Sequence, residues 1–293
     1  MQNAAIKHWI MAIRPKTLFA SISPVLLAGA FAGKTDPMSI LLFISCMSVA
    51  VLLQSAANLA NDYYDWQYGT DRSDRLGPAR VTAGSLIKAH HIKTAFLLLI
   101  AASAVPGLFI VFSTDRRLII LGAVCMVLAV AYTSKPLKLA YRGFGETAAF
   151  IFFGIVPCSA TYYVLTGGAD IPNLLGGIMC GLFAAAIMAV NNLRDIHTDK
   201  LSGKTTIAGL LGEKKARIFT IALITIAILS PAAIAAASGK PLIVLAVIML
   251  IPNIKSFKRL LTEPISKNFN LSLAATAKTE FLSTAATSIL WLI

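Results

Sequence analysis

Charge is the first thing that this sequence lacks. Only 13% of its 293 residues are charged, and just 13 of them are acidic. With a mean hydropathy of +0.76, the chain is too apolar for a soluble globular domain. Apolar runs of about 20 residues, the length that crosses a hydrocarbon core, recur along almost the whole chain. The sequence therefore predicts an all-α, polytopic membrane protein.

Cysteine is also scarce, and its placement excludes two kinds of site. All four cysteines lie inside predicted spans, and no two of them form a close pair. Neither a disulfide framework nor a zinc site is supported. The sequence has no EF-hand spacing and no Walker-type phosphate loop either. No cleavable signal pattern begins the chain, so we expect the first helix to stay in the protein.

Nine apolar runs are candidates for membrane-spanning helices. They lie at 17–33, 38–60, 93–113, 118–134, 147–166, 173–194, 216–237, 241–254 and 270–293. No linker or low-complexity tract separates them, so residues 1–293 are expected to form a single domain. Lys278 and Glu280 fall inside the last run, where few charges are expected. Three explanations stay open: the two side chains face a cavity, they extend to the membrane interface, or the helix begins after residue 270.

The basic residues are distributed unevenly over the predicted loops. If the N-terminus is cytoplasmic, 22 of the 26 lysines and arginines fall on the cytoplasmic side when Lys278 is counted with the 255–278 region, and the other side holds only Lys34, Arg116, Arg117 and Lys240. This positive-inside pattern predicts a cytoplasmic N-terminus and an outer C-terminus. Because the basic residues are spread over several loops without a nucleic-acid-binding motif, no nucleic-acid partner is expected.

Two acidic clusters stand where predicted helices meet the cytoplasmic interface. Each has an asparagine followed by two aspartates at helical spacing: Asn58, Asp62 and Asp65 after the second span, and Asn191, Asp195 and Asp199 after the sixth. Residues three and four apart share a helix face, so each cluster is expected to form an oxygen-bearing stripe. The N-x-x-x-D spacing is common to both, and glycine and basic residues follow each. Two matched half-sites are predicted.

Carboxylates are costly at a membrane surface unless they are hydrated, paired or bound to a cation. Oxygen ligands favour hard cations, and Mg²⁺ is usually held by one or two carboxylates together with substrate phosphates. Two facing stripes would clamp a diphosphate through metal ions, with arginine and lysine neutralising its other oxygens. For any single aspartate, a helix cap or a solvated interface residue is an equal alternative.

The residues around these clusters resemble one known family. The patterns N-D-x-x-D-x-x-x-G-x-D at 61–71 and R-D-x-x-x-D-x-x-x-G-K at 194–204 are similar to the acidic motifs of the UbiA superfamily of intramembrane aromatic prenyltransferases. Four more segments resemble the branch that prenylates 1,4-dihydroxy-2-naphthoate in menaquinone synthesis: WIMAIRPKTL at 9–18, DRLGPARVTAGSL at 74–86, YTSKPLKLAYRGFGE at 132–146 and DIHTDKLSGKTTIAGLLG at 195–212. The resemblance covers nearly the whole chain.

The resemblance implies a nine-helix bundle in the bacterial cytoplasmic membrane, with lipid around it and a central cavity near the cytoplasmic face. It also implies Mg²⁺-dependent ionisation of an allylic polyprenyl diphosphate, attack by the aromatic acid, and loss of CO₂ to give demethylmenaquinol. The matching metal ligands are Asp62, Asp65, Asp195 and Asp199, with Asn58 and Asn191 as oxygen partners. The expected substrate contacts are Asp71, Arg80, Tyr132, Lys135 and Lys204.

Two alternatives stay open at this point. The same fold with another aromatic acceptor, such as 4-hydroxybenzoate in ubiquinone synthesis, differs in the lining of the pocket. A cation-coupled secondary transporter with an inverted repeat would also place twinned acidic half-sites near helix ends. The acids lie at the cytoplasmic ends of helices that show no break in mid-span, and this favours the transferase.

Overall fold

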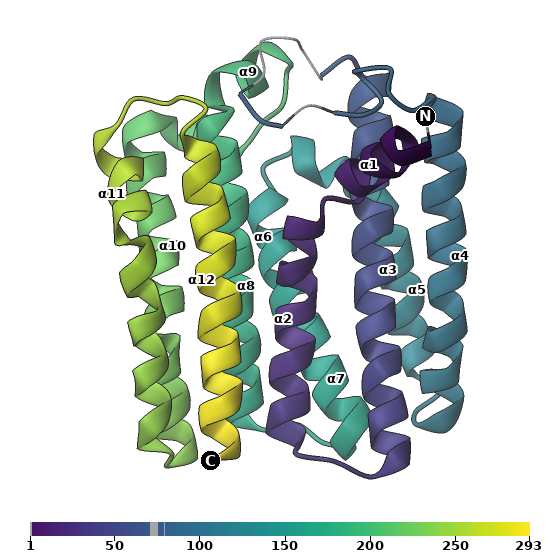
Figure 1. Ribbon diagram of the computed structural model, residues 1–293, viewed down its shortest axis with the longest axis vertical. Coiled ribbons are helices and arrows are strands. Elements are labelled where there is room, and N and C mark those ends of the chain that lie inside the picture. The colour runs from purple at the N-terminus through teal and green to yellow at the C-terminus, as the bar shows by residue number, and fades with distance from the viewer. Residues whose placement is uncertain (1, 71–75, 79) are drawn as a thin grey trace.

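The computed structural model describes residues 2–70, 76–78 and 80–293 of the chain. Among these residues the regular structure is helical, apart from one short parallel bridge between Arg142 and Thr205. The helices run side by side as an upright bundle, and the N- and C-termini lie at opposite ends of it (Figure 1). The predicted all-α class is confirmed.

Among the described residues, seven helices extend along the bundle: α2 (Pro15–Ala32), α3 (Pro37–Gln67), α4 (Ala89–Ser113), α5 (Leu118–Ala131), α8 (Ile171–Arg194), α10 (Ile207–Ser238), which is kinked at Gly212, and α12 (Phe269–Leu292). Two further segments are composite. In the first, α6 (Gly145–Phe150) continues through the π-helical turn η2 (Ile151–Ile155) into α7 (Val156–Thr166). In the second, the 3₁₀ helix η3 (Pro241–Asn253) continues into α11 (Ile254–Thr262). The short elements are α1 (Gln2–Ile13), η1 (Leu139–Tyr141) and α9 (Ile196–Leu201).

Six segments of the described chain are long and apolar enough to cross a membrane, so the chain is an integral membrane protein. They are Pro37–Gln67, Ala89–Ser113, Gly145–Thr166, Ile171–Arg194, Ile207–Ser238 and Pro241–Thr262. A seventh candidate joins the end of α1 to α2 across a bend of 57°. The predicted run at 241–254 is the N-terminal part of a longer segment, because α11 continues it. The count of nine crossings stays a prediction.

The starts of α3 and α8 are fixed by matching caps. An Asp36 side-chain oxygen accepts a hydrogen bond from the Ser39 amide at 3.0 Å, and Asp170 accepts one from the Asn173 amide at 2.7 Å. Such caps stabilise a helix by about 1 kcal/mol, since they satisfy amides with no partner inside the helix. Both helices start at the end of the bundle that holds the C-terminus (Figure 1). They therefore carry their acidic C-terminal motifs to the same opposite end.

Helix α8 packs against the α6–η2 segment through backbone contact. A Cβ atom added at Gly154 would lie 2.2 Å from Cα of Gly181, and one added at Gly181 would lie 2.5 Å from the Phe150 carbonyl oxygen. Small residues allow this close approach, which is typical of helix pairs in membranes. A larger side chain at either position would push α8 outward and displace the acidic motif at its end.

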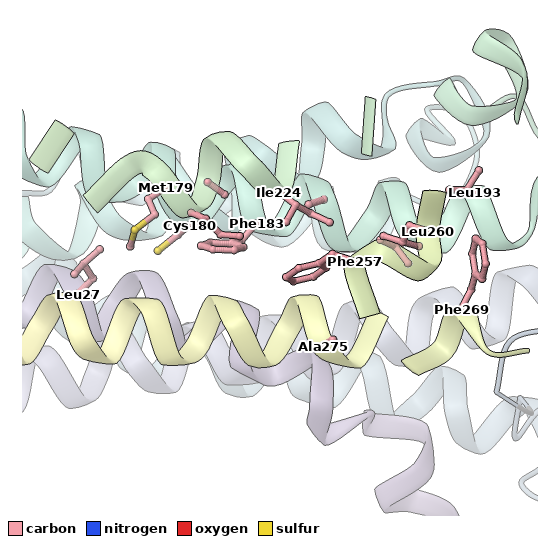
Figure 2. Close-up of a cluster of buried hydrophobic side chains, with 14 of the residues drawn as sticks. Leu27, Met179, Cys180, Phe183, Leu193, Ile224, Phe257, Leu260, Phe269 and Ala275 are labelled. Atoms are coloured by element: carbon pink, nitrogen blue, oxygen red, sulfur yellow. The ribbon is translucent and has the colours of Figure 1, made fainter. Parts of the chain in front are cut away.

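The largest buried apolar cluster joins α8 to α10, α11 and α12 (Figure 2). Its most buried members include Met179, Phe183, Leu193, Leu260 and Phe269. Large apolar side chains also cover the outside of the bundle, as at Val105 and Phe112, which are 73% and 72% exposed. An apolar exterior of this kind is typical of membrane proteins, in which each helix satisfies its own backbone hydrogen bonds.

Candidate active site

A cavity of about 1180 Å³ lies inside the bundle, as the resemblance implied. Asp65, Asp195 and Asp199 line it near the end where the long connections α3–α4, α5–α6 and α8–α10 gather (Figure 1). Leu118 and Val164, near the opposite end, line it as well. The cavity therefore runs from a charged end into an apolar interior.

Of the described acids of the first motif, Asp65 is the one that lines the cavity. One of its carboxylate oxygens pairs with Nη2 of Arg80 at 2.8 Å, and the other accepts a hydrogen bond from the Tyr141 hydroxyl at 2.6 Å. The Tyr141 hydroxyl also lies 3.0 Å from the hydroxyl of Thr70. Charge-assisted bonds of this length are stronger than neutral ones. They hold the Asp65 carboxylate in one orientation.

The Asp62 side chain contacts Thr82 and not the partners of Asp65. Its side chain is only 2% exposed, and Oδ2 accepts from the amide and hydroxyl of Thr82 at 3.4 and 3.3 Å. Oδ1 has no hydrogen-bond partner, and Asp62 is not among the described residues that line the cavity. At about 100° per residue, position 62 is turned by roughly 60° from position 65. That rotation takes Asp62 out of the stripe, whereas Asn61 lines the cavity.

Asn58 lines the cavity, but its polar atoms are already engaged. Nδ2 donates to the carbonyl oxygen of Ile13 at 2.7 Å and to the hydroxyl oxygen of Thr17 at 2.9 Å. Oδ1 accepts from Nε2 of Gln54 at 3.3 Å. Asn58 therefore links α3 to the turn between α1 and α2 and holds that turn beside the cavity.

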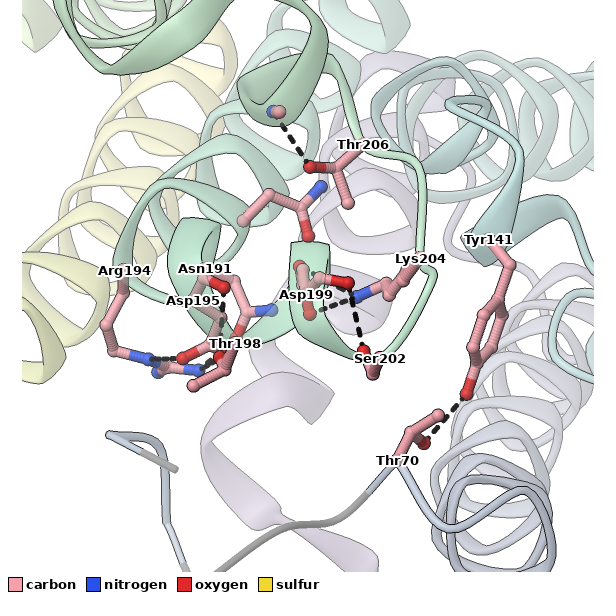
Figure 3. A network of polar contacts seen from close by, with 12 residues as sticks. Thr70, Tyr141, Asn191, Arg194, Asp195, Thr198, Asp199, Ser202, Lys204 and Thr206 are labelled. Carbon is pink, nitrogen blue, oxygen red and sulfur yellow. Dashed lines mark hydrogen bonds and ion pairs between the residues drawn. The ribbon is translucent and has the colours of Figure 1, made fainter. Parts of the chain in front are cut away.

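The second motif is organised by Arg194, which is 1% exposed (Figure 3). Its Nε and Nη2 atoms bind the two carboxylate oxygens of Asp195 at 2.9 and 2.5 Å. Nη2 also donates to Asn191 at 2.8 Å, and Nη1 donates to Asn270 of α12 at 2.7 Å. Asn270 in turn donates to the carbonyl oxygen of Leu76 at 3.0 Å. The fork of Arg194 thus joins α8, α12 and the α3–α4 connection.

Asp199 and Lys204 form the other pair of the second motif (Figure 3). The Lys204 ammonium lies 3.3 Å from an Asp199 carboxylate oxygen, and the Lys204 amide donates to the Asp199 carbonyl oxygen at 2.9 Å. Gly203 makes this turn possible with a φ of +70°, a left-handed conformation that glycine adopts without strain. The turn brings the basic side chain back over the acid.

The α5–α6 connection joins the two motifs. The Tyr141 side chain contacts Asp65, while the Tyr141 carbonyl oxygen accepts from the Thr205 amide at 3.1 Å. Lys138 lies over the Tyr68 ring, with its ammonium 3.3 Å from the ring centroid, and 4.7 Å from that of Tyr141. Desolvation by burial lowers the pKa of Lys138 below its ordinary value. Leu139, Ala140 and Tyr141 of this connection line the cavity.

The remaining predicted residues occupy different surroundings. Tyr132 lines the cavity, and its hydroxyl lies 3.7 Å from the sulfur of Met188. Lys135 is exposed and is not among the described lining residues; its amide donates to the Tyr68 hydroxyl at 3.1 Å. Asp71 lies outside the described residues.

The charged end has the donor set for a metal that arrives with phosphate. Among the described residues, no three histidine, cysteine or acidic side chains are grouped as a ready-made metal site. The three cavity-lining carboxylates are each held by a basic side chain: Asp65 by Arg80, Asp195 by Arg194 and Asp199 by Lys204. Mg²⁺ is usually bound by one or two carboxylates plus substrate phosphates, so this arrangement fits it.

The comparison with known families agrees with the fold. Residues 21–274 match the UbiA prenyltransferase family. The chain belongs to this family. It is 33% identical over 247 residues to the 1,4-dihydroxy-2-naphthoate octaprenyltransferase of Haemophilus influenzae, a match that covers 82% of this chain and 80% of that protein. The enzyme of the same name from Escherichia coli is 34% identical over 233 residues, which cover 76% of this chain and 74% of that one.

Solved structures of UbiA homologues share the fold at low sequence identity. A UbiA homologue from Archaeoglobus fulgidus, bound to GPP and Mg²⁺, aligns with a TM-score of 0.69 at 16% identity and covers 98% of this chain and 100% of that one. The apo structure of a homologue from Aeropyrum pernix K1 aligns with a TM-score of 0.68 at 16% identity, over 89% and 94% of the two chains. The UbiA-type architecture is therefore shown for this chain.

Three site residues of this UbiA-family chain were not expected from its sequence: Asn61, Tyr141 and Arg194. Asn61 had a signal, since Asn61 and Asp65 repeat the N-x-x-x-D spacing of Asn191 and Asp195. Both members of this pair line the cavity, which makes it the better match to the second motif. Arg194 stands within the quoted motif, but only the structure shows its four contacts. Tyr141 reaches Asp65 across 76 positions of sequence.

Proposed function

We propose that this protein transfers a polyprenyl group from an allylic polyprenyl diphosphate to 1,4-dihydroxy-2-naphthoate. The ring carbon that bears the carboxylate forms the new bond, the allylic C–O bond breaks with its electron pair on the diphosphate, and CO₂ leaves to give demethylmenaquinol. The names of the relatives that cover most of this chain support the acceptor.

One observation carries the proposal: a single cavity joins the acidic and basic end to an apolar interior. Asp65, Asp195 and Asp199 would hold Mg²⁺ at the charged end, with Asn61, Asn58 and Asn191 beside them and Asp62 behind Asp65. When bound, Mg²⁺ supplies positive charge to the departing diphosphate. Arg80 and Lys204 are placed to neutralise its remaining oxygens. Preorganised charge lowers the barrier to ionisation.

The apolar part of the cavity serves the rest of the reaction. Leu108 and Val111 of α4, Leu118 of α5 and Val164 of α7 provide surface for an isoprenoid tail. Burying each CH₂ group of that tail is worth about 0.8 kcal/mol, so the chain stays out of water. The same walls exclude water from the allylic cation and protect it from hydrolysis.

The orientation in the membrane is also a proposal. Lys34, Arg116, Arg117 and Lys240 belong to the short connections at the end of the bundle that holds the C-terminus (Figure 1). The positive-inside rule then supports a cytoplasmic charged end in the bacterial inner membrane, with nine crossings and an outer C-terminus. A green fluorescent protein fused to the C-terminus should stay dark; a bright fusion would contradict this orientation.

The function is tested with purified protein in detergent. The reaction contains an allylic polyprenyl diphosphate, either 1,4-dihydroxy-2-naphthoate or 4-hydroxybenzoate, and either Mg²⁺ or EDTA; products are identified by mass. A prenylated, decarboxylated naphthoquinol formed only with Mg²⁺ is expected. Product from 4-hydroxybenzoate alone would reassign the acceptor, and no product from either acid would refute the transferase.

A further inference from the structure

Lys278 is an ionisable residue in the middle of α12, eight positions after Asn270. Because Asn270 contacts Arg194 at the charged end, Lys278 lies about 12 Å further along the helix axis. Its side chain is exposed and lines the cavity. Helix α12 occupies the predicted span at 270–293, where a charge is costly, and such residues mark substrate pathways.

Lys278 differs from the other basic residues of the cavity in having no partner within the described part of the chain. Arg80, Arg194 and Lys204 pair with aspartates, and Arg14 has interactions of its own. Among the described residues, no hydrogen bond, ion pair or ring contact reaches the Lys278 ammonium. An unpaired cation that lines an apolar cavity gains stability by pairing with an anion.

An aromatic pair lies next to this cation. Phe281 is three positions after Lys278 and so shares its helix face. The Phe281 ring packs against Phe19 of α2, with 4.9 Å between the centroids, and both residues line the cavity. A cation beside two apolar rings matches an aromatic carboxylate, because the acid group reaches the charge while its ring covers apolar surface.

Gln54 provides a hydrogen-bond acceptor in the cavity. Gln54 is 8% exposed and lines the cavity, and its Oε1 atom has no partner. Its Nε2 atom donates to Thr17 at 3.3 Å, two residues before Phe19. Gln54 is therefore linked through α2 to the Phe19–Phe281 pair. The free oxygen would accept a hydrogen bond from an aromatic hydroxyl group.

We propose that Lys278 binds the carboxylate of the aromatic acceptor, with the ring against Phe19 and Phe281 and a hydroxyl group on Gln54. The inference rests on the proposed function and names the acceptor subsite within it. A metal, a diphosphate and a reacting pair of carbons in line span on the order of 10 Å. The rise of about 12 Å along α12 from Asn270, which contacts Arg194 beside the acids, to Lys278 is of that size, so the lysine serves the acceptor and not the diphosphate.

The first test measures KM for each substrate in Lys278→Met and Lys278→Arg, with Lys34→Met, an exposed loop lysine, as the matched control. Lys278→Met is expected to raise the KM for 1,4-dihydroxy-2-naphthoate about 10- to 100-fold, the effect of one bond to a charged group. The KM for the prenyl diphosphate should change less than twofold, and Lys278→Arg should recover part of the loss. A rise confined to the donor KM would overturn the proposal.

The second test measures binding without turnover. Equilibrium dialysis in EDTA, with no prenyl diphosphate, compares labelled 1,4-dihydroxy-2-naphthoate with 1,4-dihydroxynaphthalene, which has no carboxylate. Lys278→Met should weaken binding of the acid only. Equal weakening of both ligands, or of neither, would overturn the lysine assignment. Failure of the wild-type protein to form a prenylated product would instead refute the proposed function. The two failures are distinguishable, because the binding measurement in EDTA tests the role of Lys278 without turnover.

Discussion

The two acidic motifs contain the same residue types but take their partners from different distances along the chain. Asp195 and Asp199 are held by Arg194 and Lys204, one and five positions away. Asp65 is held by Arg80 and Tyr141, 15 and 76 positions away. The second half-site is therefore built almost entirely by local sequence, whereas the first depends on two separate connections reaching α3. A change in those connections should therefore affect the first half-site more than the second, which they touch only through Leu76 and Thr205.

The largest expected effects come from replacing one aspartate in each half-site, and they test whether the two half-sites contribute equally to kcat. Asp65→Asn and Asp199→Asn should each lower kcat about 10²- to 10³-fold, since each removes charge that acts on the departing diphosphate. Product formation at saturating substrates is the measurement. Asp36→Asn is the matched control, because asparagine caps a helix as well as aspartate does. Wild-type kcat in either site variant would remove that half-site from the mechanism.

Arg80→Ala should weaken binding of the prenyl diphosphate at the first half-site. The Arg80 guanidinium contacts Asp65 at 2.8 Å, and its loss should raise the KM for the prenyl diphosphate about 10- to 100-fold. The KM for the naphthoate should change much less. Arg117→Ala removes a similar pair, with Asp115 at 2.8 Å, at the opposite end of the bundle. If both variants keep the wild-type donor KM, Arg80 contributes only to membrane topology.

Asp62→Asn separates the two aspartates of the first motif. Asp62 is buried against Thr82 and does not line the cavity, so its replacement should lower kcat about tenfold, less than Asp65→Asn does. The two variants are compared at equal Mg²⁺ concentrations. A loss in Asp62→Asn as large as that in Asp65→Asn would make Asp62 a direct metal ligand.

Tyr141→Phe should give the smallest change. It removes one hydroxyl from Asp65 while leaving the backbone contact between Tyr141 and Thr205 intact. Because Tyr141 only orients Asp65, part of the energy of this bond reaches the reaction, and kcat/KM should fall about 3- to 10-fold. Tyr163→Phe deletes a comparable bond, to Asp115 at 2.7 Å, far from the site and should leave kcat/KM unchanged. Equal rates in both variants would mean that Tyr141 does not orient Asp65.

The sequence alone determined the class and the ends of the helices that carry the chemistry. Apolar runs long enough to cross a membrane predict helices, and an acidic motif at the end of two of them predicts a polar site at one membrane surface. The second half-site also follows from sequence, because Asp195 and Asp199 find basic partners within five positions. Such contacts depend on helix and turn geometry, which is local.

The tertiary structure decided which face of α3 lines the cavity and which distant side chains reach it. A rotation of roughly 60° separates Asp62 from Asp65, and the packing of α3 against its neighbours selects between them. Tyr141 and Lys278 acquire their positions in the same way, one from a loop and the other from α12. Helix rotation and loop placement arise from contacts between segments far apart in the chain, so spacing within one segment does not determine them.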